Sequence, residues 1–168
     1  FPENDLWIWG FSLGGIHALA IAGGSSKTIL SGENQNAPLL PGFCFSGIIT
    51  SGSGGRIRPE GKQSLNLPIL DSMPPESVLH EAARNLSAEY FVSFYGSLDG
   101  TFSEESCRKI LREVPLPETR KIFHVIEGAD HPFKHLHGHP SLKPLEIMAE
   151  RLTPLLQPGP PGFQSEIS

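Results

Sequence analysis

Four short apolar stretches punctuate the chain, and polar or glycine-rich residues follow each of them. They cover residues 6–9, 43–50, 90–95 and 121–126. Continuous apolar runs of this length are typical of strands that are covered on both faces of a sheet. The pattern therefore predicts four buried strands at these positions.

Between and after these stretches, apolar residues recur three or four positions apart, the spacing of one helix face. Ser103 is placed to cap one such helix, because two glutamates follow it where the helix dipole is positive. The expected helices cover residues 13–22, which end at two glycines, residues 77–86, the segment after Ser103, and a last helix that ends near Pro154.

Strands and helices therefore alternate along the chain, which favours a mostly parallel sheet with right-handed crossovers and helices on both faces. The expected fold class is α/β, in one domain over residues 1–157. Residues 25–42 are expected to form a long surface loop, and no clear period is found over residues 56–75. Residues 158–168 are rich in proline and glycine, so we expect a disordered tail.

Composition narrows the possible functions. The chain has 168 residues and a net charge of −5 without a long basic run, which argues against a nucleic-acid-binding protein. The two cysteines, Cys44 and Cys107, cannot build a disulfide-rich scaffold. Residue 1 is Phe rather than Met, so we interpret the chain as a piece of a longer protein.

Residues 6–26 carry no charge and are long enough to raise the question of a membrane helix. Glycines interrupt this run, and its apolar half differs in composition from its alanine-rich half, so a strand, a turn and a helix are the better interpretation. No basic segment precedes the run, which argues against a signal peptide. We therefore expect no transmembrane segment and a cytoplasmic protein.

The turn after the first predicted strand contains a candidate reactive serine. Residues 10–14 read Gly-Phe-Ser-Leu-Gly, a G-x-S-x-G pattern between an apolar strand and an apolar helix. A serine at such a turn has a strained backbone, and its hydroxyl projects above the sheet. We expect the flanking glycines to be required because side chains would clash across the turn. The alternative is an unreactive Gly/Ser loop.

A serine nucleophile needs a base, and the base needs an orienting acid. Of seven histidines, His131 follows the last predicted strand, whereas His17 shares the helix after Ser12 and His124 lies inside a strand. Asp99 follows the third strand. The carboxyl ends of parallel strands lie at one sheet edge, where ligands bind. Ordinary turn roles remain open for Asp99, and capping or surface roles for Asp130.

In this order, Ser12, Asp99 and His131 with their flanking glycines resemble the C-terminal half of the α/β-hydrolase superfamily over roughly residues 6–156. The resemblance implies that Ser12 is the nucleophile, His131 the general base and acid, and Asp99 the orienting carboxylate. It also implies that the backbone N–H of Leu13 contributes to the oxyanion hole. Phe11, in the slot before the serine, is expected to contact substrate.

The chain departs from that family in what precedes the first strand. The early strands of the family, and the loop that gives the second oxyanion donor, have no counterpart, so the fold is expected to be an incomplete, C-terminal portion. Residues 52–89 resemble a short cap-like insertion with one helix. Asp71 and Glu60 in this insertion remain alternatives for the acid, because some members draw it from the preceding strand.

We expect neither a cofactor nor a resident metal. His131, His135, His137 and His139 form a histidine-rich loop that we interpret as solvated, because no complete set of structural ligands accompanies it. Residues 23–28 lack the glycines of a phosphate-binding loop. The expected partner is a small ester or acyl substrate, and the oligomeric state is left open.

Two functional hypotheses follow. The first is a serine hydrolase that cleaves a carboxylic ester or thioester through an acyl-enzyme. The second is a catalytically incomplete, hydrolase-like fragment or binding domain.

Overall fold

The computed structural model describes residues 6–24, 43–65, 68 and 73–156. Four parallel strands form its main sheet, in the order β1 (Trp7–Phe11), β2 (Phe45–Ser51), β3 (Ala88–Gly96) and β4 (Lys121–Ile126). All strand pairs run parallel and in continuous register, for example Gly10 against Thr50. The predicted parallel sheet is thus confirmed: β4 has the predicted bounds, and the ends of the other three strands differ by one or two residues.

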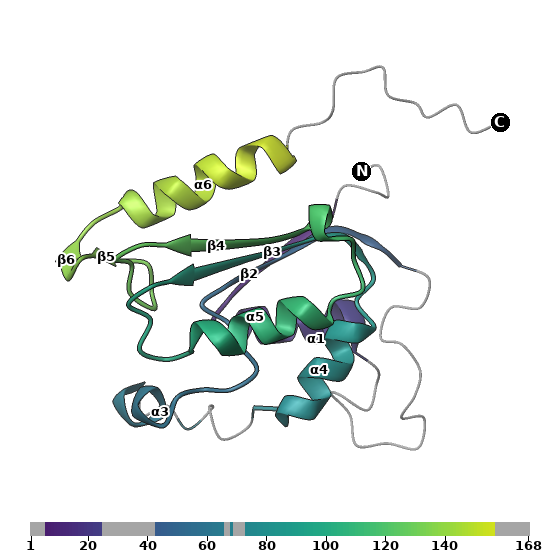
Figure 1. The fold of residues 1–168 in the computed structure, drawn as a ribbon, viewed down its shortest axis with the longest axis horizontal. Helices are drawn as coiled ribbons and strands as arrows, with labels where there is room; N and C mark the ends of the chain where they lie inside the picture. The colour runs from purple at the N-terminus through teal and green to yellow at the C-terminus, as the bar shows by residue number, and fades with distance from the viewer. Residues whose placement is uncertain (1–5, 25–42, 66–67, 69–72, 157–168) are drawn as a thin grey trace.

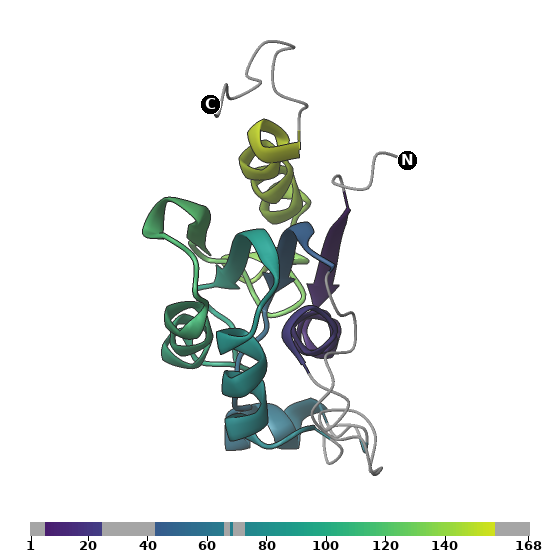
Figure 2. The ribbon, with the colours of Figure 1, turned by 90° about the vertical axis from the view of Figure 1, so that its right-hand side faces the viewer.

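Helices cover both faces of this sheet, as predicted (Figure 1). The helices α1 (Leu13–Gly23), α4 (Glu76–Arg84) and α5 (Glu104–Glu113) lie on one face, and α6 (Lys143–Leu156) lies on the other (Figures 1 and 2). Each face has its own apolar core. The first includes Leu19, Leu79, Phe91 and Ile110, and the second includes Ile49, Phe94, Met148 and Leu152.

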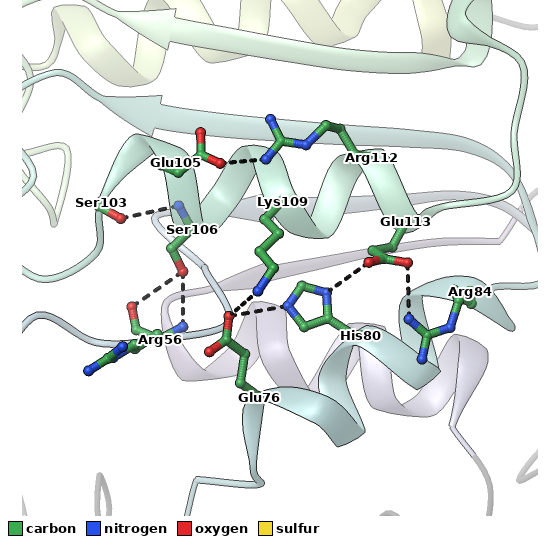
Figure 3. Close-up of polar contacts among 10 residues, drawn as sticks. All are labelled: Arg56, Glu76, His80, Arg84, Ser103, Glu105, Ser106, Lys109, Arg112 and Glu113. Atoms are coloured by element: carbon green, nitrogen blue, oxygen red, sulfur yellow. Dashed lines mark hydrogen bonds and ion pairs between the residues drawn. The ribbon is translucent and has the colours of Figure 1, made fainter.

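Polar contacts join α4 to α5 outside the apolar core (Figure 3). Glu76 accepts hydrogen bonds from Lys109 Nζ at 2.9 Å and from the ring of His80 at 3.3 Å. Glu113 accepts one from Arg84 at 3.0 Å, and its other oxygen lies 3.7 Å from His80 Nδ1. The imidazole of His80 is therefore held between two carboxylates, one from each helix.

The first strand is less covered than the sequence pattern predicts. Within the described residues β1 pairs with β2 alone, and the side chains of Trp9 and Phe11 are 52% and 45% exposed. Trp7 and Ile8 are half-buried. The expectation of a strand covered on both faces is met only in part for β1 among the described residues, because Trp7 packs against the second core whereas Trp9 and Phe11 stay about half exposed.

Several short elements carry too little periodicity to be predicted. They are α3 (Pro59–Leu65), the 3-10 turn η2 (Glu118–Arg120), β5 (His135–Leu136) and β6 (His139–Pro140). The β5–β6 hairpin turns at His137 and Gly138, which both have positive φ, 52° and 81°. This is the tight turn whose twist suits a hairpin, so Gly138 is the signal that the pattern analysis passed over.

The described part of residues 52–89 contains two α-helices, α3 and α4, where one was expected. The apolar face of α4 packs in the main core, with Leu79, Ala82 and Ala83 buried. At the other end of the chain, α6 continues to Leu156 with Pro154 inside it, two residues beyond the predicted end. The predicted loop over residues 25–42, the predicted tail and Asp71 lie outside the described residues. No described helix combines the length and the apolar character needed to cross a membrane.

Candidate active site

Ser12 occupies the sharp turn between β1 and α1. Its backbone has φ 54° and ψ −119°, a region that non-glycine residues rarely adopt and that costs about 1–3 kcal/mol. Two contacts hold the turn: Ser12 N–H donates to Ser51 O at 2.8 Å, and the Ser53 hydroxyl donates to Ser12 O at 2.8 Å. The strained serine turn predicted from the sequence is therefore present.

The clash expected across the turn is found at one of the two glycines that flank Ser12. A Cβ on Gly10 would lie 2.2 Å from Gly14 O, and a Cβ on Gly15 would lie 2.1 Å from Ser53 Oγ. A Cβ on Gly14 would meet nothing within 4 Å. The expected clash at both flanking glycines is therefore wrong for Gly14, because its Cβ direction faces open space rather than the turn.

The structure brings His131 and Asp99 to the serine. His131 Nε2 lies 3.0 Å from Ser12 Oγ, and His131 Nδ1 lies 2.9 Å from Asp99 Oδ2. Ser12 follows β1, Asp99 follows β3, and His131 follows β4, so all three come from the carboxyl-end edge of the sheet. Because an ionised carboxylate only accepts hydrogen bonds, Nδ1 carries the proton and Nε2 can accept from the Ser12 hydroxyl.

Asp99 is enclosed and fully engaged. Its side chain has no exposed surface, and its Oδ1 accepts backbone N–H groups from Thr101 at 2.7 Å and Phe102 at 3.0 Å. The turn role that the sequence left open for Asp99 is therefore occupied as well, by the same carboxylate. One oxygen organises its own loop, and the other orients His131.

Aromatic rings and a glycine surround the imidazole of His131. Phe11 and Phe102 lie against it, with ring centroids 5.1 Å and 5.8 Å away. Gly52 has φ 56°, and a Cβ there would lie 3.0 Å from His131 Nδ1. Phe11 is thus both exposed and next to the serine and the histidine, the position from which a substrate contact is possible.

Leu13 is the first residue of α1, directly after Ser12. The first N–H groups of a helix have no acceptor within the helix, and the positive end of the dipole lies there. Charge that develops on an oxygen bound at Ser12 would face this end of α1. The geometry is compatible with the oxyanion role expected for the Leu13 N–H.

The other histidines lie elsewhere. His17 is exposed and its Nδ1 contacts Leu13 O at 2.7 Å. His124 stacks on Phe94, and its burial together with the charge of Arg151 lowers its pKa. His80 lies between α4 and α5 in the network of Figure 3. Of the histidines in the described ranges, only His131 contacts Ser12.

Of the two alternative acids, only Glu60 lies in the described chain, and it is not at this centre. Glu60 is exposed in the first turn of α3, while the carboxylate on His131 belongs to Asp99. The Cys107 thiol is buried, and burial chiefly raises its pKa to about 12, so it stays protonated near neutral pH. Among the described residues, no group of three or more potential ligand side chains is placed to hold a metal ion.

Sequence reasoning passed over Ser53 and Gly52, which support the candidate centre, and it did not pair Asp130 with His135. The sequence leaves a capping or a surface role open for Asp130. In the structure, its side chain caps backbone N–H groups within the loop that carries His131. The spacing of Asp130 and His135 matches neither a helix nor a strand period, so periodicity could not have revealed their pairing.

Comparison with known proteins gives structural matches alone. No protein-family model matches this sequence, and no curated protein sequence is significantly similar to it. Among solved structures, the esterase domain of a Rhodothermus marinus protein is 19% identical, with a TM-score of 0.50 over 86% of this chain and 59% of that chain.

Two lipases are similar in the same way. The monoacylglycerol lipase of Paleococcus ferrophilus is 14% identical, with a TM-score of 0.56 over 91% of this chain and 68% of that one. A soluble variant of the Saccharomyces cerevisiae monoglyceride lipase is 15% identical, with a TM-score of 0.58 over 90% and 61%. This chain thus spans about three fifths of the length of the esterase domain and of the yeast lipase. At such low identity the likeness bears on the fold, and it shows that the chain has the α/β-hydrolase fold.

Proposed function

We propose that this chain carries the nucleophile, base and acid of a serine hydrolase that cleaves a carboxylic ester or thioester through an acyl-enzyme. The observation that carries the proposal is the relay from Ser12 Oγ to His131 Nε2 at 3.0 Å and from His131 Nδ1 to Asp99 at 2.9 Å. Such a relay is the arrangement that activates a serine hydroxyl. The likeness in fold to esterases and lipases supports the same reaction class.

In the proposed mechanism, Ser12 Oγ attacks the acyl carbon while His131 Nε2 takes its proton. Asp99 keeps the imidazole oriented and stabilises the imidazolium that forms. The N–H of Leu13 faces the oxygen that becomes negative, and Phe11 forms one wall against the substrate. The imidazolium then protonates the leaving alcohol or thiol, and a water activated by His131 releases the acid.

A fluorophosphonate probe tests this proposal in the full-length protein. The wild-type protein is expected to be labelled at Ser12, and Ser12→Ala is expected to abolish labelling and to lower turnover of a short-chain aryl ester by several orders of magnitude. Ser141→Ala is the matched control, because this half-buried serine lies outside the relay and is expected to leave labelling unchanged. Labelling that survives in Ser12→Ala would overturn the assignment.

A second candidate function is a hydrolase-like domain that binds without catalysis. The observation that favours it is the length of the match, because the chain spans about three fifths of the length of two structural neighbours, the esterase domain and the yeast lipase. A folded full-length protein that resists the probe and hydrolyses no ester or thioester would support this second function over the first.

A further inference from the structure

The loop that carries His131 is tied at its base to the loop that carries Asp99. Gly128 N–H donates to Ser97 Oγ at 2.8 Å, and Leu98 N–H donates to Ala129 O at 2.9 Å. These bonds fix where the loop leaves β4. They do not reach residues 131–135, which need contacts of their own to hold His131 against Ser12.

The carboxylate of Asp130 supplies those contacts. Its Oδ1 accepts backbone N–H groups from Lys134 at 2.9 Å and His135 at 3.1 Å, and its Oδ2 accepts from His135 Nδ1 at 2.6 Å. Residues 130–135 therefore form a ring that the Asp130 side chain closes, together with a longer backbone hydrogen bond from Asp130 N–H to His135 O at 3.4 Å. His131, the second residue of this ring, cannot move outward while the ring stays closed.

The ring also contains a strained residue. Phe133 has φ 56°, which is rare for a bulky side chain, and its own side chain is 1% exposed, with its ring edge on Phe11. Such a conformation persists only when surrounding contacts enforce it. The Phe133 N–H bond to Asp130 O, at 3.1 Å, is one such contact, and the Asp130 carboxylate closes the far side.

Charge favours the closed ring at neutral pH. Partial burial of Asp130 by itself raises the pKa, but the hydrogen bonds from the His135 ring and from the backbone of His135 and Lys134 outweigh it and leave the pKa below its ordinary value. The carboxylate is therefore ionised and accepts all three hydrogen bonds.

We infer that Asp130 and His135 are positioning residues that set the distance from His131 Nε2 to Ser12 Oγ by closing the loop around His131. This inference rests on the proposed hydrolase function. Small displacements of a reacting group cost large factors in rate, so an open ring is expected to slow the chemistry at Ser12 more than it weakens substrate binding.

The test uses Asp130→Ala, His135→Ala and His135→Asn in the full-length protein. Lys134→Ala is the control, because only its backbone meets Asp130. Opening the ring in Asp130→Ala is expected to lower kcat and the fluorophosphonate labelling rate by about 10²-fold, with KM changed far less. His135→Ala is expected to give a smaller loss, and His135→Asn, which keeps a donor near the position of Nδ1, is expected to recover part of it.

A second readout separates positioning from general stability. The downfield NMR signal of the His131 Nδ1 proton, assigned by its loss in His131→Gln, is expected to shift or broaden in Asp130→Ala and His135→Ala while both stay folded. Wild-type labelling and an unmoved signal in both variants would overturn the inference and leave the proposed function standing. A wild-type protein that is not labelled would overturn the proposed function instead, and the NMR signal would still decide whether Asp130 places His131. If Asp130→Ala does not fold, the two His135 variants decide by the same criteria.

Discussion

At the residue scale, Asp99 is the most constrained member of the candidate centre. Its carboxylate accepts two backbone N–H groups through one oxygen and the His131 ring through the other. A buried group whose contacts are all satisfied has one orientation. Asp99 therefore fixes both its own loop and the tautomer of His131, and these two effects can be separated by substitution.

Asp99→Asn tests the second effect. The amide oxygen can replace Oδ1 as acceptor for Thr101 and Phe102, so the fold is expected to survive, but the NH2 group then faces His131 Nδ1 and favours the wrong tautomer. We expect a loss of about 10³–10⁴ in kcat, measured on an aryl ester. Glu60→Gln and Asp71→Asn are expected to stay near wild type. If one of these is inactive while Asp99→Asn is active, the acid lies in the 52–89 segment.

The two glycines that flank the serine give a matched pair for stability. Gly10→Ala places a Cβ against backbone atoms of Gly14 and Gly15, which cannot rotate away, so we expect a loss of about 1–3 kcal/mol in the free energy of unfolding. Gly14→Ala meets open space within α1 and is expected to be neutral or to stabilise by up to about 1 kcal/mol. Urea unfolding measures both. Equal losses in the two variants would contradict this account.

At the scale of elements, α4 and α5 are joined by an apolar contact and by the polar network drawn in Figure 3. The hydrogen bond from Lys109 chiefly, then that from His80, lowers the pKa of Glu76 below its ordinary value of 4.5. A carboxyl whose pKa is lower in the folded state stabilises the fold above its ordinary pKa, and this stabilisation is lost as the pH falls through the folded value. The network should therefore weaken in acid.

Glu76→Gln removes that pH dependence. Because the Glu76 side chain is 36% exposed, solvent screens the interaction, and we expect a loss of less than about 1 kcal/mol in the free energy of unfolding at neutral pH. The difference from wild type should shrink as the pH falls below 4.5. Glu105→Gln, whose partner Arg112 lies on the same helix, is the control. A difference that grows in acid would contradict the assignment.

At the scale of the whole molecule, the described part of the sheet ends at β1, a strand that carries large apolar side chains. Within the described residues β1 has one partner, and Leu6, Trp9 and Phe11 are 50%, 52% and 45% exposed. An edge strand with unpaired backbone groups and large apolar side chains readily pairs with other chains. The same edge lies next to Ser12, so its environment bears on activity as well as on solubility.

We therefore predict that the 168-residue chain, expressed alone, associates and shows little or no ester hydrolysis. Light scattering, amide hydrogen exchange over Trp7–Trp9 and an aryl ester assay measure this. Exchange in β1 is expected to be much faster than in β3, which is paired on both sides. A monodisperse monomer with a protected β1 and high activity would show that the described sheet is sufficient by itself.

The sequence by itself determined the element order and the α/β class, and it singled out Ser12 as the candidate nucleophile. These follow from local information: apolar runs of strand length, helical spacing, and a serine between glycines at a strand–helix junction. The resemblance to the α/β-hydrolases then implied a role for each of Ser12, Asp99 and His131. The structure brings those three side chains into contact. Short elements such as α3 and the β5–β6 hairpin were not predicted, because a segment of so few residues shows no hydrophobic period.

Only the tertiary structure decided which contacts hold these residues in place. Ser53 reaches the Ser12 carbonyl across 41 positions, and Asp130 closes a loop whose spacing matches no regular element. A Cβ would clash at Gly10 but not at Gly14, and this difference depends on which atoms face each residue. The motif shows glycine at both positions and cannot distinguish them. The exposure of β1 likewise follows from what packs beside it. All of these contacts depend on distances between residues that are far apart in the sequence, and a local sequence pattern contains no information on those distances.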